Sequence, residues 1–356
     1  MDELTADSAL SRAHGAALFR QVGGPLEFTG PSAADSTADA PVDVLSPRGP
    51  LRGVRVAEIE AGTWTWLTAL TERGPEPASD ELLRLASALH QGAPVVLAPR
   101  DQGPAMVVAL MVEDSAAALP EVSLRQVLVE GLRDTPDESR AALRSFASKH
   151  GIDLREEENH LWLGSQRVDM QGDMALQVPA EGSPTLADIF ADSFYLSTEH
   201  QLFFEGRFPE HQRPRLDLGT STAHGMEALV LGTFSRDFFT WAWADPGFPA
   251  IAQTPSRHLY AFGLTHGILP FLRPRLPLEQ ATRWDVAVLA KPILGAWTHA
   301  VAPLTPERHA LILLRSPSLH LPPLNHEVSQ RVLAEPLPRG IDEQRARAAY
   351  TRARKA

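Results

Sequence analysis

The sequence predicts an α+β protein of two related units, each an antiparallel meander covered by helices on one face, with the first copy degenerate. Three observations lead to this prediction. The chain has 356 residues, which at roughly 100–200 residues per domain corresponds to about two domains. Segments with strand periodicity alternate with segments of helix periodicity. A short aromatic pattern occurs once in each half, as Thr-Trp-Thr-Trp at 63–66 and as Thr-Trp-Ala-Trp at 240–243.

Residues 1–120 are predicted to form the degenerate first unit. Apolar residues in the first twenty positions follow a helical spacing that ends at the Gly-Gly-Pro sequence of 23–25. The stretch of about 25–50 is rich in Pro, Ser, Ala and Asp, so we expect a disordered linker there. The other expected elements are a strand pair over 54–67, a helix capped by Ser79, and strands at 95–98 and 106–112.

Residues 121–180 are predicted to be a helix–hairpin insertion. Two helices are expected at 124–132 and 139–150. Gly151 follows the second helix at the position of a left-handed C-cap residue. A hairpin-like segment of short apolar runs then covers 161–178.

Residues 181–317 are predicted to form the complete unit. A long helix over 186–204 begins it, and a strand meander over 216–244 follows. The meander ends at Asp245-Pro246-Gly247, because proline cannot donate to a sheet ladder and glycine adopts turn geometry freely. Helices at 256–267 and 279–302 and a strand at 310–314 complete the unit, and residues 318–356 form a proline-rich segment with a basic C-terminal helix.

Further matches between the halves favour an internal duplication. Ala6-Asp7-Ser8 with His14 recurs as Ala191-Asp192-Ser193 with His200, each time inside a predicted helix. An apolar strand comes later in both halves. The matches follow the same order, so we interpret the halves as copies of one helix–meander–helix–strand unit.

The second half also resembles a known family. Its motifs are Leu-Gly-Thr-Phe at 231–234, Trp-Ala-Trp-Ala-Asp-Pro at 241–246, and Phe-Gly-Leu-Thr-His-Gly-Ile at 262–268. Together they resemble an uncharacterised bacterial family, known only as a domain of unknown function, over about 185–317. The family usually has Asn where this chain has Asp245. Because the family has no established activity, the resemblance implies a fold and no catalytic residues.

Composition excludes several classes of function. The chain has no cysteine, so disulfides and thiolate metal sites are excluded. Its net charge of −11 disfavours nucleic acid as a partner. We expect no targeting segment and no membrane-spanning helix, and therefore a cytoplasmic protein. No phosphate-binding glycine loop and no His-Glu-x-x-His pair occurs, so we expect no cofactor and no metal.

Two groups of residues are candidates for a site. Strand alternation places Phe239, Trp241 and Trp243 on one face, either as an aromatic wall of a ligand pocket or as part of a sheet core. Asp245 and His266 are weak catalytic candidates as a general acid and base. They are equally consistent with a turn residue and a helix ending.

The sequence thus favours a cytoplasmic protein that acts by binding a protein partner or a small ligand, without catalysis. The alternative is a cofactor-independent hydrolase that uses Asp245 and His266. The oligomeric state stays open. One basic cluster, in the C-terminal tail, is where an anionic partner is expected; it contains Arg345, Arg347, Arg352, Arg354 and Lys355.

Overall fold

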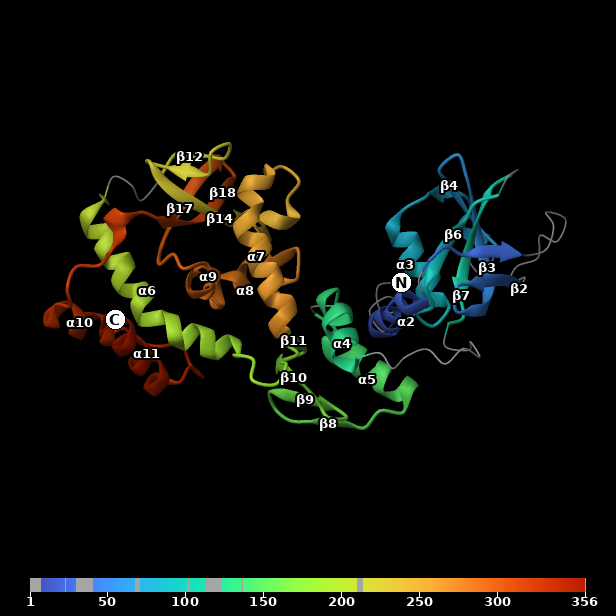
Figure 1. Ribbon diagram of the computed structural model, residues 1–356, viewed down its shortest axis with the longest axis horizontal. Coiled ribbons are helices and arrows are strands. Elements are labelled where there is room, and N and C mark those ends of the chain that lie inside the picture. Colours follow the sequence, from blue (N-terminus) through green and yellow to red (C-terminus); the bar gives the residue numbers. More distant parts are fainter. Residues whose placement is uncertain are drawn as a thin grey trace. The chain divides into compact units, whose positions relative to one another are not determined.

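The chain divides into two compact units, which we call unit 1 (Met1–Val178) and unit 2 (Pro179–Ala356). The computed structural model describes residues 8–22, 24–29, 41–67, 71–100, 103–112, 123–135, 137–209 and 214–355. Helices and antiparallel sheets build both units, which confirms the α+β class (Figure 1). The segment 121–180, expected to be an insertion, belongs almost entirely to unit 1.

Unit 1 is built around a seven-stranded antiparallel sheet. Its strands run in the order β1-β2-β3-β4-β5, and the β6–β7 pair joins β3 through β7. Helices α4 and α5 pack against α2, and a separate four-stranded sheet has the order β11-β10-β9-β8. The elements are α2 (Ala9–Val22), β1 (Glu27–Thr29), β2 (Pro41–Ser46), β3 (Gly49–Glu60), β4 (Thr63–Trp66), a 3-10 helix (Thr71–Arg73), β5 (Glu76–Pro77), α3 (Asp80–Leu89), β6 (Val95–Ala98), β7 (Ala105–Leu110), α4 (Leu124–Arg133), α5 (Ser139–His150), β8 (Leu154–Glu156), β9 (His160–Leu163), β10 (Gln166–Gln171) and β11 (Met174–Gln177).

The disordered linker expected over about 25–50 is wrong for the described part of that stretch. Strands β1 and β2 and the start of β3 lie there, and residues 30–40 lie outside the described residues. In β2 the side chains of Val42 and Val44 alternate with exposed residues and are buried. The alternation that makes a strand was present but short, and the surrounding Pro, Ser and Asp residues concealed it.

Unit 2 contains a second seven-stranded antiparallel sheet. Its strands run in the order β12-β13-β14-β15-β16, and the β17–β18 pair joins β14 through β18. The elements are α6 (Leu186–Arg207), β12 (Leu216–Asp217), β13 (Thr222–Ala223), β14 (Met226–Phe234), β15 (Phe238–Trp241), η3 (Ala242–Ala244), α7 (Ala250–His266), η4 (Leu269–Phe271), β16 (Arg275–Pro277), α8 (Leu278–Arg283), α9 (Val286–Leu294), β17 (Thr298–Thr305), β18 (Arg308–Arg315), η5 (Pro317–Leu319), α10 (His326–Leu333) and α11 (Glu343–Lys355).

The single helix expected over 279–302 is wrong. The chain forms two helices, α8 and α9, and then enters strand β17. Gly295 ends α9 in the left-handed conformation (φ 63°), which glycine adopts without steric cost. The alternating burial that follows in β17 is that of a strand.

The two seven-stranded sheets have the same strand order. Each also shifts register where its central strand meets its last strand, between Arg55 and Ala57 in β3 and between Val230 and Gly232 in β14. Immediately after the shift, Ala57 pairs with Trp66 and Gly232 pairs with Trp241. Superposing the two pairings aligns Thr63–Trp66 with residues 238–241. The sequence match of 63–66 to 240–243 is therefore shifted by two residues from the structural alignment.

The sequence predicted that helices cover one face of each sheet. In the structure, the central strands have hydrophobic residues packed on both faces. In β18, Leu311 and Leu313 belong to one hydrophobic cluster, whereas Ile312 and Leu314 belong to another. Strand β7 divides its residues between two clusters in the same way. Because side chains alternate across a strand, each sheet is the middle layer of its unit.

Helix α6 has a well-defined start and a polar contact with the C-terminal helix. Thr185 and Asp188 form a reciprocal capping box at its N-terminus. Arg345 of α11 pairs with Asp188 at 2.5 Å and with Asp192 at 2.6 Å. Figure 1 shows α10 and α11 beside α6, so the C-terminal segment is an integral part of unit 2.

Within the described residues, no helix has the length and apolar character needed to cross a membrane.

We expect Gly232→Ala to lower the free energy of unfolding by about 1–3 kcal/mol, the usual cost of overpacking. A Cβ atom at Gly232 would overlap the carbonyl oxygen of Thr240 on the neighbouring strand and approach the ring of Phe239. Urea unfolding measures the effect. The matched control is Gly206→Ala in α6, where a Cβ meets nothing within 4 Å. That variant should be neutral or stabilising, and equal losses in both variants would contradict the close strand approach.

Candidate functional site

The residues nominated from the sequence form the core and a turn of unit 2. Phe239 and Trp241 are fully buried, and the Trp241 indole donates a hydrogen bond to the carbonyl oxygen of Pro270 at 3.0 Å. Trp243 does not share their strand face, because β15 ends at Trp241 and Trp243 lies in η3 against Tyr260. The strand ends two residues before Trp243, so the strand alternation used in the prediction does not apply to this residue.

The structure does not bring Asp245 and His266 together. Asp245 precedes α7, and its carboxylate pairs with Arg308 at 2.5 Å and accepts a hydrogen bond from the Gly247 amide at 2.9 Å. His266 is the last residue of α7, where its ring lies against Phe262 and within 3.2 Å of the Ser183 hydroxyl. A helix of this length spans about 25 Å, far beyond hydrogen-bond reach.

A pocket of about 650 Å³ lies elsewhere in unit 2, and we call it the unit 2 pocket. It is enclosed by α6, the turn from α9 into β17, the end of β18 and the C-terminal helix α11. Its lining consists of Leu196, His200, Gly295, Ala296, Trp297, Thr298, Leu314, Arg315, Ser316, Leu319, His320, Leu321, Ala353 and Arg354.

Arg354 is held in the pocket wall by a buried network. Its Nε lies 3.0 Å from the Glu199 carboxylate, and its Nη2 donates to the carbonyl oxygen of Pro322 at 2.7 Å. The Tyr350 hydroxyl donates to the same carboxylate at 2.9 Å. Glu199 is only 3% exposed, so the network joins α6 to α11 and fixes the guanidinium.

His200, the residue after Glu199, provides a neutral ring to the pocket lining. Burial, together with the positive charges of Lys291 and Arg354, lowers the pKa of His200 to about 4. The imidazole is therefore uncharged at neutral pH. It stacks on Trp297 with ring centroids 6.1 Å apart and an interplanar angle of 20°. Trp297 thus provides the aromatic surface that the sequence had suggested for Trp241 and Trp243.

A fully buried lysine lies close to this pocket. Lys291 of α9 donates a hydrogen bond to the Ser197 hydroxyl of α6 at 2.6 Å. Burial lowers the pKa of Lys291 to about 7, although Asp285 and Glu205 oppose the shift. Burial and the Lys291 charge also lower the pKa of the neighbouring His299 to about 3. A single lysine inside the apolar run of α9 was the signal from which sequence reasoning could have found it.

Two polar atoms of the lining residues have unmet hydrogen-bonding capacity. Thr298 Oγ1 and His200 Nδ1 are buried and have no hydrogen-bond partner in the described part of the chain. Buried polar groups in proteins are normally satisfied. Both residues line the pocket, and the two atoms themselves are covered by protein.

The basic C-terminal cluster contributes one residue to the pocket. Arg345 and Arg347 form ion pairs with acidic residues of unit 2, whereas Arg354 lines the cavity. Across the described residues, no group of three or more His, Asp or Glu side chains could hold a metal ion.

Comparison with known proteins places part of unit 2 in context. A family model described as a family of unknown function (DUF6882) matches residues 187–317. This match confirms the resemblance to a domain-of-unknown-function family, and it leaves α10 and α11 outside. The searches of curated proteins and of solved structures found no match.

We expect one of the three lysines to titrate near pH 7, because burial in α9 disfavours the charged amine. Lysine carbon-13 NMR against pH measures this directly, and the titrating signal should vanish in Lys291→Met. Absence of such a signal, or its survival in the variant, would contradict the assignment.

Lys291→Met should raise the free energy of unfolding at pH 7 by on the order of 3–5 kcal/mol. The unfolded lysine takes up its proton as pH falls below its ordinary value of 10.5, whereas the folded one does so only near 7. The gain is therefore nearly complete at pH 7, stays at that level at lower pH, and declines toward pH 10. Urea unfolding across this range measures it, with Lys355→Met at the exposed end of α11 as the control. A loss of stability at pH 7 would contradict the prediction.

Proposed function

We propose that unit 2 binds a small organic anion in the unit 2 pocket. One observation carries this proposal: the lining includes His200, His320, Arg315 and Arg354, and none of the described lining residues is Asp or Glu. The whole chain has 44 acidic against 33 basic side chains. A cavity lined by cations and neutral donors in an acidic protein selects anions.

The two guanidinium groups supply the main recognition. Arg354 is anchored by Glu199, and Arg315 by Glu227 at 3.1 Å and by the carbonyl oxygen of Leu294 at 2.5 Å. Such anchoring keeps the forks in position before a ligand arrives, so little side-chain entropy is lost on binding. Guanidinium groups match the two oxygens of a carboxylate or a phosphate.

Other lining groups favour a ligand with a flat part. The stacked rings of Trp297 and His200 offer an aromatic surface. The volume of about 650 Å³ lies within the usual range of small-molecule sites.

This proposal keeps the non-catalytic binding function and the cytoplasmic location expected from the sequence, and it favours a small ligand over a protein partner. The hydrolase alternative finds no support, since α7 separates Asp245 from His266. Sheet and helices therefore act as a scaffold for binding, and no reaction step is assigned to the pocket.

We also propose that the two units arose by duplication. The equal strand order and the equally placed register shift support a common ancestor. The pairing of Pro77 with Thr63 and of Pro277 with Phe238 at equivalent strand positions adds to this support. Unit 1 has no helix corresponding to α7 among its described residues, in keeping with a shortened first copy.

We expect benzoate and phenyl phosphate to change the tryptophan fluorescence saturably at pH 7, and neutral benzamide not to do so. Arg354→Gln should raise the dissociation constant of both anions about tenfold or more, the usual effect of a lost charged hydrogen bond. Arg352→Gln, on the exposed side of the same helix, should leave it unchanged.

Loss of Arg354 also leaves Glu199 without its cation, so a second variant separates binding from folding. Arg315→Gln removes a lining guanidinium whose partner Glu227 is half exposed. It should weaken the anions while the unfolding transition stays in place. Failure of both anions to bind at millimolar concentration, or equal weakening by Arg352→Gln, would overturn the proposal.

A further inference from the structure

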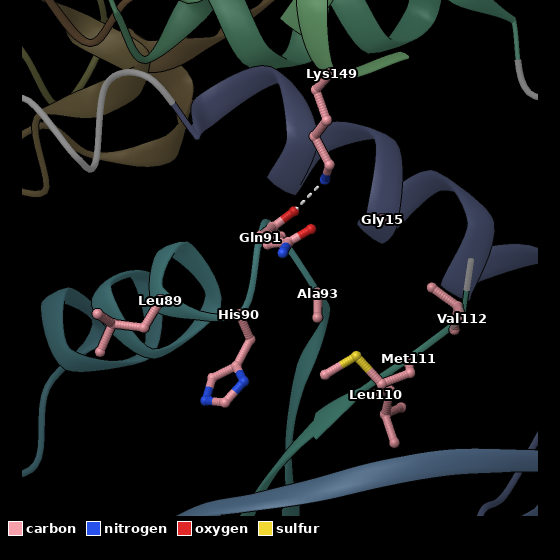
Figure 2. Close-up of a pocket in the computed structure, with 9 residues that line it drawn as sticks. All are labelled: Gly15, Leu89, His90, Gln91, Ala93, Leu110, Met111, Val112 and Lys149. Carbon is pink, nitrogen blue, oxygen red and sulfur yellow. Dashed lines mark hydrogen bonds between the residues drawn. The ribbon is translucent and has the colours of Figure 1, made fainter. Parts of the chain in front are cut away.

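Unit 1 contains its own pocket, which we call the unit 1 pocket. It has a volume of about 230 Å³ and lies between α2, the turn from α3 into β6, the end of β7 and α5. Figure 2 shows Lys149 reaching from α5 toward Gln91, while Leu110, Met111 and Val112 lie at the strand end. The lining consists of Gly15, Leu89, His90, Gln91, Ala93, Leu110, Met111, Val112 and Lys149.

Strand register shows that the two pockets occupy equivalent positions. Leu110 pairs with Gly53, and Leu314 pairs with Ala228. Gly53 lies four residues before Ala57, which pairs with Trp66, and Ala228 lies four residues before Gly232, which pairs with Trp241. Met111 and Val112 thus take the places of Arg315 and Ser316.

The cation of each pocket lies near the C-terminal end of a helix. Lys149 is the second-to-last residue of α5, and Arg354 is the second-to-last residue of α11. The ammonium group of Lys149 donates to the carbonyl oxygen of Gln91 at 2.6 Å, which holds it at the rim. None of the described lining residues is Asp or Glu, so the charge at this rim is positive.

The chemistry of the unit 1 pocket nevertheless differs. Ala93 stands where unit 2 has Trp297, so the aromatic surface is absent from this lining. Met111 and Val112 replace a guanidinium and a hydroxyl with aliphatic groups. Leu89 and Met111 offer apolar surface near the Lys149 cation, and His90 and Gln91 add polar groups to the lining. This arrangement suits a small amphipathic anion.

Glycine keeps this pocket small. A Cβ atom on Gly15 would come within 2.6 Å of the carbonyl oxygen of Gly92, so α2 passes as close to the turn as a glycine permits. The helix therefore forms a fixed wall. A ligand for this pocket must be smaller than one for the unit 2 pocket.

We propose that the unit 1 pocket is a second binding site, which takes a small aliphatic monocarboxylate. The alkyl chain lies against the partly exposed side chains of Leu89 and Met111, and the carboxylate meets Lys149. The proposal is independent of the anion site in unit 2, because it uses no residue of that unit. The chain then carries two sites of different selectivity on equivalent scaffolds.

The test uses butyrate as the probe and the methionine methyl groups as reporters. The chain has six methionines, and Met111→Leu assigns the signal of Met111 in a methyl-labelled sample. Butyrate should shift the Met111 signal saturably, whereas butylamine should not. Lys149→Gln should raise the dissociation constant about three- to fivefold, as expected for an exposed ion pair, and Lys149→Glu should raise it further.

Two controls make the outcome decisive. Lys355→Gln removes a cation outside the pocket and should leave the butyrate titration unchanged. Arg315→Gln, which weakens the unit 2 pocket, should also leave the Met111 response intact, so failure of one site is distinguished from failure of the other. A Met111 signal that does not respond to butyrate, or an equal response in Lys149→Glu, would overturn the proposal.

Discussion

Antiparallel pairing between the central strand and the last strand of each sheet is the constraint on which both units depend. In unit 2, β14 pairs with β18 along nearly its whole length, and β3 pairs with β7 in unit 1. The last strand brings distant parts of the chain together and divides the core into two layers. Both pockets lie where this strand ends and the first helix of the unit passes, so the pairing that closes the sheet also positions the site.

Folding of unit 2 buries two charged side chains, Glu199 and Lys291, and they are accommodated in different ways. Glu199 is satisfied by Arg354 and Tyr350, which come from α11, so the C-terminal helix neutralises a buried charge and delivers a guanidinium to the pocket at the same time. Lys291 has no comparable ion pair within 4.0 Å among the described residues. It responds to burial by a lowered pKa. Unit 2 thus contains a stabilising network around Glu199, which holds the wall of the pocket, and a destabilising buried lysine, Lys291.

Errors in the sequence reading have identifiable physical causes. The strand β17 was assigned to a helix, because the apolar residues of α9 continue through Trp297 to the start of β17 and only Gly295 marks the end of the helix. Trp243 was placed with Trp241 because the strand period was extended into η3. The α+β class and the capped helices α3 and α6 were predictable, since their signals are local: a periodic apolar face and a capping side chain.

The sequence by itself determined the class of fold, most helix and strand positions, and the segment that matches a family of unknown function. It also singled out Arg354 as part of a basic tail, and His200 as part of a repeat. Only the tertiary structure decided that these two residues share a pocket with Trp297. The physical reason is that periodicity and capping report contacts within a few residues. The pocket depends on strand register and helix packing between residues 196 and 354, which no local pattern encodes.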